Sequence, residues 1–147
     1  MDALKIENFS SANRGSAFPT FEHLSPSDCA HLRSEIANRI GLDPQTKPLR
    51  LLETLHAQAK PLTSVDEAGF ELRAVISVAG FNGCSDVYVN WYRFDHIDRI
   101  ALLDLSKYFS DIWYPSSDDI EIFDGSLDWF VLITHDGLVS VLDVSRR

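Results

Sequence analysis

The sequence has few of the features that mark a specialised class of protein. Its 147 residues include only two cysteines, Cys29 and Cys84, which are too few for a disulfide framework and are predicted to be small buried thiols. The longest apolar runs, such as residues 129–133, are far shorter than the ~20 residues that cross a bilayer. Residues 1–20 lack a basic start followed by an apolar segment, so no secretory signal is predicted. We therefore expect a cytoplasmic protein without membrane association.

Positive charge is almost missing from one long stretch of the chain. Residues 104–143 contain a single basic residue, Lys107, and nine acidic ones, so this stretch carries −8 of the total charge of −9. The first sixty residues carry seven charges of each sign. An acidic chain without a basic stripe repels nucleic-acid phosphates, which argues against direct DNA or RNA binding. A basic protein partner is the natural counterpart of such a charge distribution.

The composition is that of an ordinary globular domain. Hydrophobic residues make up 45% of the chain and charged residues 24%, and the length suffices for one well-filled core. We expect one domain over residues 1–147. Residues 1–22 are polar and are predicted to form an irregular lead-in, with a short strand around Leu4–Phe9.

Two helices are predicted in the first half of the chain. Ser25 can cap the first helix, Pro26 suits its first position, and Gly41 is a good stop. The second helix is predicted near Pro48–Ala59, with Pro61 ending it.

The rest of the chain is predicted to be mainly strands. Apolar residues alternate over residues 70–78, Asn82-Gly83 is a strong hairpin dipeptide, and residues 86–94 form the return strand. Further strands are expected at 99–103, 120–123, 128–134 and 138–143, with a short helix over 105–112 that Asp104 can cap. This order predicts an α+β fold in which two N-terminal helices pack on a mainly antiparallel sheet with one short inserted helix. The strand order stays open.

An acidic and aromatic segment holds the candidate binding residues. Aromatic rings beside carboxylates bind Lys and Arg through ion pairs and cation–π contacts. A protein-binding surface is therefore predicted, and it consists of Trp113, Tyr114, Asp118, Asp119, Glu121, Asp124 and Asp128. The alternative interpretation is that Trp113 packs in the core and that the acidic residues only turn the chain.

No catalytic, metal or cofactor site is predicted. The spacing of the carboxylates is too irregular for a calcium loop. His135-Asp136 resembles a metal-binding pair, but with Gly137 it sits where a hairpin turn is required. His96 lies near two aspartates and could act as a base, yet no nucleophile is paired with it in the sequence. We expect a solvated histidine there.

Two motifs in the C-terminal part of the chain also suggest a family. They are Tyr108-Phe109-x-Asp111-Ile112-Trp113-Tyr114-Pro115 and Ser117-Asp118-Asp119-Ile120-x-Ile122-Phe123-Asp124, followed by Trp129 and His135-x-Gly137. In this stretch, from Leu105 to Leu142, the chain resembles small bacterial immunity proteins of polymorphic-toxin and contact-dependent inhibition systems. The resemblance implies a cytosolic protein that binds and neutralises a cognate secreted toxin and has no catalysis of its own. It transfers no fixed set of binding residues.

Two other functions remain open at this point. The chain could be an enzyme or ligand-binding domain in which carboxylates and His96 meet in a pocket. A concave site that contains His96 or His135 together with two acidic side chains would favour it. The chain could also be a regulatory scaffold whose partner is not a toxin. The oligomeric state is not predicted.

Overall fold

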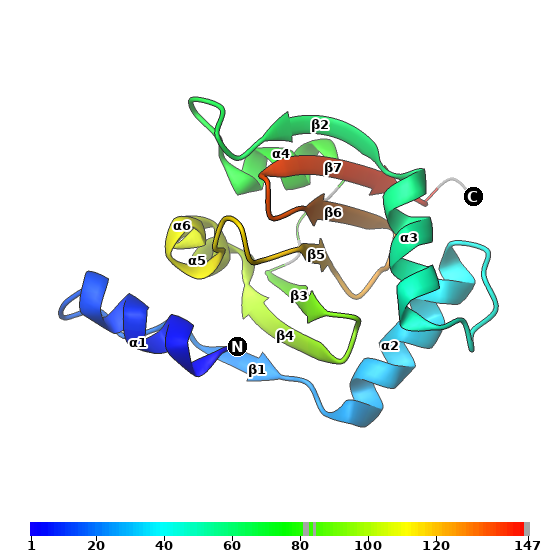
Figure 1. Ribbon diagram of the computed structural model, residues 1–147, viewed down its shortest axis with the longest axis horizontal. Helices are drawn as coiled ribbons and strands as arrows, with labels where there is room; N and C mark the ends of the chain where they lie inside the picture. The colour runs from blue at the N-terminus through cyan, green and yellow to red at the C-terminus, as the bar shows by residue number, and fades with distance from the viewer. Residues whose placement is uncertain (81–82, 84, 146–147) are drawn as a thin grey trace.

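A seven-stranded antiparallel sheet forms the centre of the protein (Figure 1). The computed structural model describes residues 1–80, 83 and 85–145. The strands are β1 (Phe21–His23), β2 (Lys60–Ser64), β3 (Asp86–Tyr92), β4 (His96–Ala101), β5 (Ile120–Phe123), β6 (Trp129–Ile133) and β7 (Leu138–Asp143). Their order across the sheet is β1-β4-β3-β5-β6-β7-β2, and each neighbouring pair is antiparallel.

Helices cover both faces of this sheet. They are α1 (Ala3–Ala12), α2 (Pro26–Arg39), α3 (Pro48–Gln58), α4 (Leu72–Val78), α5 (Leu102–Lys107) and α6 (Phe109–Ile112). One core cluster joins α2 and α3 to the sheet, and a second cluster joins α4, α5 and α6 to its opposite face. The predicted α+β class with an antiparallel sheet is therefore confirmed. Within the described residues, none of the helices has the length and apolarity that a membrane span requires.

The two central strands are buried on both sides. In β6, Trp129, Val131 and Ile133 belong to the core under α4–α6. The alternate residues Phe130 and Leu132 belong to the core under α2 and α3. All four residues of β5 are also buried. This double burial explains why the strands read as continuous apolar runs in the sequence.

Several elements lie where the sequence predicted them. The Ser25 side chain accepts a hydrogen bond from the Asp28 N–H at 3.1 Å, so α2 begins with the expected cap. The second helix, α3, and the strand β5 have nearly the predicted bounds. β6 and β7 form the predicted hairpin, and Gly137 adopts the positive φ of 88° that this turn requires.

Other predictions are wrong. Residues 72–78 form the helix α4 instead of a strand, because Leu72, Val75 and Ile76 make a buried helical face that the alternating pattern hid. β3 pairs with β4 and β5, so the predicted hairpin with residues 70–78 does not exist. The proposed Asn82 turn position lies outside the described residues. Residues 3–12 form α1 instead of an irregular lead-in with a strand, and Asp2 caps that helix.

Smaller boundaries also differ from the prediction. The expected single helix over 105–112 is divided into α5 and α6, and Asp104 lies in the first turn of α5 instead of at its cap. The strand predicted at 99–103 is β4, which begins earlier at His96. Pro61 lies inside the edge strand β2, next to an irregularity in its pairing with β7.

The burial of α4 gives a test that separates a helix from a strand. In the helix, Val75 is 6% exposed and Val78 is 65% exposed, whereas the alternating pattern placed Val78 inward. We expect Val75→Asp to lower the free energy of unfolding by about 3 kcal/mol, because it buries a carboxylate. Val78→Asp should lower it by less than about 1 kcal/mol. Urea denaturation of both variants measures this, and the reverse order would contradict α4.

Candidate protein-binding site

The loop between α6 and β5, residues 113–119, is held in one conformation by its own polar groups. The Trp113 indole N–H donates to the Asp118 carbonyl at 3.0 Å, and the Asp118 carboxylate accepts from the Tyr114 N–H at 2.8 Å. Ser116 has a positive φ of 68°, and its N–H donates to the His135 carbonyl at 2.7 Å. This 113–119 loop therefore presents Trp113 and Tyr114 in fixed positions.

On one side of this loop, Tyr114 and Asp118 enclose a lysine. Lys5, from α1, forms an ion pair with Asp118 and donates to the Ile112 carbonyl at 2.8 Å. Its Nζ lies 3.8 Å from the centroid of the Tyr114 ring and 5.0 Å from that of the Trp91 ring. These contacts are of the kind that the sequence predicted for this segment, but the lysine belongs to the same chain.

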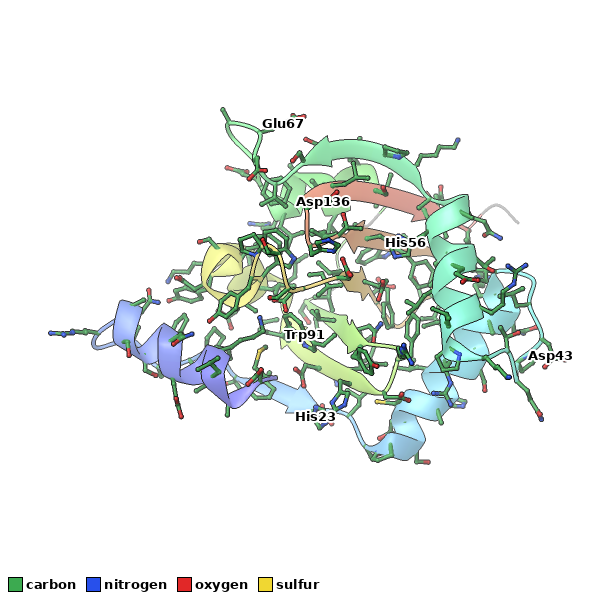
Figure 2. All side chains as sticks on the ribbon, viewed as in Figure 1. His23, Asp43, His56, Glu67, Trp91 and Asp136 are labelled. Atoms are coloured by element: carbon green, nitrogen blue, oxygen red, sulfur yellow. The ribbon has the colours of Figure 1, made fainter. Side chains whose placement is uncertain are left out.

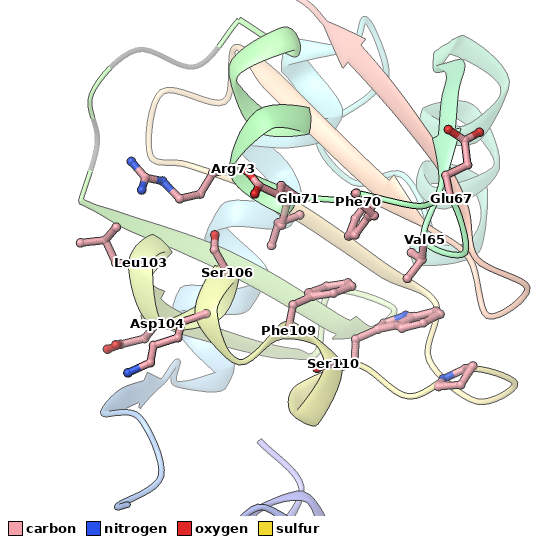
Figure 3. A pocket seen from close by; sticks show the side chains of 15 residues that line it. Val65, Glu67, Phe70, Glu71, Arg73, Leu103, Asp104, Ser106, Phe109 and Ser110 are labelled. Atoms are coloured by element: carbon pink, nitrogen blue, oxygen red, sulfur yellow. The ribbon is translucent and has the colours of Figure 1, made fainter. Parts of the chain in front are cut away.

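On the other side of the loop lies an open groove of about 980 Å³ (Figure 3). Its floor is aromatic, because Trp113 stacks on Phe109 with 5.7 Å between ring centroids, and Phe70 lies 5.7 Å from Phe109. Figure 3 shows Glu67 at one end of the groove and Glu71 along its edge. The Ser106 hydroxyl, which also lines the groove, has no hydrogen-bond partner within the described residues.

The predicted acidic surface is not a single surface, which corrects the sequence interpretation. Trp113, Glu121 and Asp124 are buried, with 5%, 2% and 8% exposure. Asp118 and Asp119 precede β5, whereas Asp124 and Asp128 lie in the connection that follows it, at its opposite end. The alternative interpretation of Trp113 as a core residue is therefore correct, although one side of its ring also lines the groove.

Each of these carboxylates has an internal partner. Asp124 accepts hydrogen bonds from Ser126, and Asp128 forms an ion pair with Arg39 of α2. Asp119 accepts from the backbone N–H of His135 at 2.7 Å and from its ring at 2.9 Å. This hydrogen bond to Asp119 raises the pKa of the exposed His135. Turn formation, the second alternative, accounts for these acidic residues better than a continuous surface does.

Glu121 belongs to a buried polar cluster under α3. It accepts a hydrogen bond from the Asn90 amide at 2.6 Å and contacts His56 Nε2 at 3.3 Å. The bond to Glu121 raises the pKa of His56, while burial of the ring opposes this shift. The side-chain oxygen Oδ1 of Asn90 accepts a hydrogen bond from the Phe94 N–H at 2.9 Å, so the cluster also fixes the β3–β4 turn.

The β6–β7 turn and the β2–α4 loop place further carboxylates near the groove. The Val65 N–H donates to the Gly137 carbonyl at 2.9 Å, which brings the loop and the turn together. Figure 2 shows Glu67 and Asp136 at the same end of the molecule. Hydrogen bonds from the Thr134 hydroxyl and the Leu138 N–H hold the pKa of Asp136 below its ordinary value. Within the described part of the chain, the carboxylates of Asp66 and Glu67 have no ion-pair partner.

A second hollow, of about 560 Å³, lies beside Lys5 and was not predicted. It is lined by Met1, Asp2, Lys5, Phe21, His23, Trp91, Tyr92, His96 and Asp118. Behind it, Asp98 is fully buried, and it contacts the terminal ammonium group, His23 Nδ1 at 2.8 Å and Trp91 Nε1 at 2.9 Å. Asp98 lies two residues before the buried Ile100, on the same face of β4, and the strand predicted at 99–103 did not include it.

No group of three or more histidine, cysteine or acidic side chains in the described ranges is arranged to hold a metal ion. No protein-family model matches the chain, and no curated protein or solved structure matches it with significance.

The contact between His56 and Glu121 predicts a pH-dependent stability. Because the folded protein raises the pKa of His56, this contribution is fully present below the ordinary pKa of ~6.5 and is lost as the pH rises through the raised value. The difference in unfolding free energy between wild type and His56→Ala should therefore be largest below about pH 6 and should shrink towards about pH 8. Chemical denaturation across this range measures it. A difference that does not change with pH, or one that survives in a Glu121→Gln background, would contradict the assignment.

Two neighbouring aspartates should differ strongly in their effect on stability. The Asp118 side chain is 16% exposed and compensates a buried lysine, whereas the Asp119 side chain is 56% exposed. We expect Asp118→Asn to lower the free energy of unfolding by about 3 kcal/mol, because it leaves the Lys5 charge unpaired. Asp119→Asn should cost less than about 1 kcal/mol. Equal effects in urea denaturation would show that Lys5 is not buried as described.

Proposed function

We propose that the protein is a non-catalytic binding protein that inhibits a basic protein partner, in the manner of a cytoplasmic immunity protein. The observation that carries the proposal is the aromatic groove beside the 113–119 loop with carboxylates along its edge. This site replaces the continuous acidic surface that the sequence predicted.

The shape of the groove supports insertion of an apolar anchor. Phe70 is partly exposed, whereas Phe109 and Trp113 beneath it are 6% and 5% exposed, so a side chain that enters the groove would bury chiefly the ring of Phe70. Protein interfaces obtain most of their affinity from a few such anchors in fitted pockets.

The charge around the groove supports a basic partner. Glu67, Glu71 and Asp66 lie in one short segment, and Asp136 lies in the adjoining turn. Arg73 and Lys107 offset part of this charge at the other end of the groove. The whole chain has a net charge of −9, which would steer a basic protein towards it and accelerate association.

The immunity role itself is supported by the resemblance of the C-terminal motifs. A secreted toxin that acts on nucleic acid must be basic to bind its substrate, so an acidic inhibitor is its natural counterpart. The groove and the charge fit that role, and they would equally serve a regulatory partner of the same chemistry.

The hollow beside Lys5 favours a second candidate function, the binding of a small ligand. It brings His96 together with Asp2 and Asp118, which is the combination that the sequence analysis required for a ligand-binding or catalytic domain. Asp98 orients His23, as a carboxylate orients a general base. Among the residues that the structure describes, none of those lining the hollow is a serine, threonine or cysteine.

Charge reversal beside the groove tests the proposed function. The partner to use is the C-terminal domain of a secreted effector encoded next to the gene for this chain, and calorimetry measures its affinity. We expect Glu67→Lys to weaken binding about tenfold, because it opposes a basic surface at the contact. Phe70→Ala should weaken binding about thirtyfold, because it removes part of the wall that holds the anchor.

Two control variants separate contact from general charge effects. Glu53→Lys on α3 changes the net charge by the same amount but lies on the other face of the sheet, so affinity should change less than about threefold. Glu35→Lys on α2, where the side chain is 51% exposed, is a second control of the same kind and should also change the affinity less than about threefold. Equal losses for Glu53→Lys and Glu67→Lys would rule out the groove, and the absence of any stoichiometric complex would rule out that partner as the target.

A further inference from the structure

One lysine of the N-terminal helix is surrounded by groups that recognise an ammonium ion. Lys5 is 6% exposed, and its Nζ contacts a carboxylate, a backbone carbonyl and the faces of two aromatic rings. Asp118 supplies the charge, and Trp91 and Tyr114 supply the rings. A desolvated cation between aromatic faces and a carboxylate is bound much more strongly than one on an open surface.

The groups that surround the ammonium come from the body of the fold, and other contacts hold them in place. The Asp118 carboxylate is fixed by the Tyr114 N–H at 2.8 Å. The Trp91 ring is fixed by its hydrogen bond to the buried Asp98 at 2.9 Å. From α1, the Asn8 amide donates to the Tyr114 hydroxyl at 3.2 Å, but the hydrogen bonds that hold Asp118 and Trp91 come from outside this helix. Another ammonium group could therefore occupy the site without reorganisation of Asp118 and Trp91.

The helix that supplies Lys5 is attached by few contacts. Of its ten residues, only Lys5 and Phe9 are buried, and Leu4 is 55% exposed. The Met1 ammonium adds an ion pair with Asp98. Figure 1 shows α1 at the margin of the molecule, outside the helices that cover the sheet. A helix of this length is marginal on its own, so local opening should cost far less than global unfolding.

The site can also be reached from outside. Lys5, Trp91 and Asp118 form part of the wall of the 560 Å³ hollow, and Asp2 adds a further carboxylate to it. An ammonium group that enters this hollow meets negative charge and an aromatic face before it reaches Asp118.

We propose that Trp91, Tyr114 and Asp118 form a lysine-binding site, which Lys5 fills in the free protein and a lysine of the basic partner fills in the complex. The identity of this second occupant rests on the proposed function. α1 is then an internal competitor that keeps the site closed until a partner with a suitable lysine displaces it. The displaced helix would also uncover Tyr108, whose ring packs against Phe9.

The ammonium preference can be measured without any partner. Lys5→Ala retains the β-carbon, so n-propylammonium replaces the atoms that the substitution removes. At tenfold excess over its dissociation constant, it should raise the Tm of Lys5→Ala by about 3–6 °C. The neutral 1-propanol, and sodium chloride at the same ionic strength, should not. Lys107→Ala is the matched control, because Lys107 also lies over a tyrosine ring, at 4.8 Å, but is exposed and has no enclosed site.

Exchange of the occupant is tested in the wild-type chain. Acetyl-Gly-Lys-Gly-amide competes with Lys5, which has a high effective concentration because it belongs to the same chain. At about 50 mM, the peptide should accelerate hydrogen exchange of the α1 amides at least about twofold. The amides of β5 and β6 should not change. The same peptide with norleucine in place of lysine should have no effect, because it lacks the ammonium group.

The outcomes separate this proposal from the groove. Equal stabilisation of Lys5→Ala by propylammonium and propanol, or unchanged α1 exchange with the lysine peptide, would overturn the lysine-binding site and leave the groove untouched. If Lys5→Ala does not fold, the exchange measurement on wild type decides alone. If Glu67→Lys and Phe70→Ala leave the affinity for the partner unchanged, the groove is overturned as the binding site, and the ammonium measurements are unaffected.

Discussion

Burial of the central strands on both faces is the constraint from which the rest of the structure follows. β5 and β6 must present apolar side chains on each side, because helices cover the sheet above and below. This constraint applies to the same part of the chain that carries nearly all the net negative charge. The carboxylates of this stretch therefore lie at strand ends, in turns or in the short helices α5 and α6, except for Glu121 inside β5, which is held by Asn90 and His56. A linear acidic segment thus becomes two groups at opposite ends of a strand.

The parts of the fold that depend on local signals could be predicted from the sequence. Ser25 and Pro26 mark the start of α2, the residues around Gly137 mark a hairpin turn, and the apolar run at 120–123 marks β5. The helix α4 could not be distinguished from a strand, because its apolar residues fit both periods and only its packing against α5 decides between them. Local sequence patterns are sufficient to predict an element where a cap or turn residue is compatible with only one local structure.

The candidate site was only partly predictable for a related reason. Tyr114 and Asp118 were predicted to bind a basic partner protein, and in the structure they contact a basic group of the same chain. That group is Lys5, which lies 113 residues before Asp118 in the sequence, and no spacing rule connects these two residues. The groove likewise combines Phe70, from the segment predicted as a strand, with Phe109 and Trp113. The chemistry of the segment was visible in the sequence, but its contacts depend on the order of the strands and the placement of the helices.

The 113–119 loop links the two sites that we propose. Trp113 faces the groove on one side, and Tyr114 faces the lysine on the other. A partner that uses both would contact consecutive residues of one rigid loop.

The two outer strands of the sheet have a consequence for behaviour at high concentration. β1 is only three residues long, and β2 carries Pro61 beside a break in its regular pairing. Short margins and a proline are poor templates for the addition of a foreign strand. The open margins of this sheet are thereby protected against amyloid-like stacking, even though its middle is among the most apolar parts of the chain.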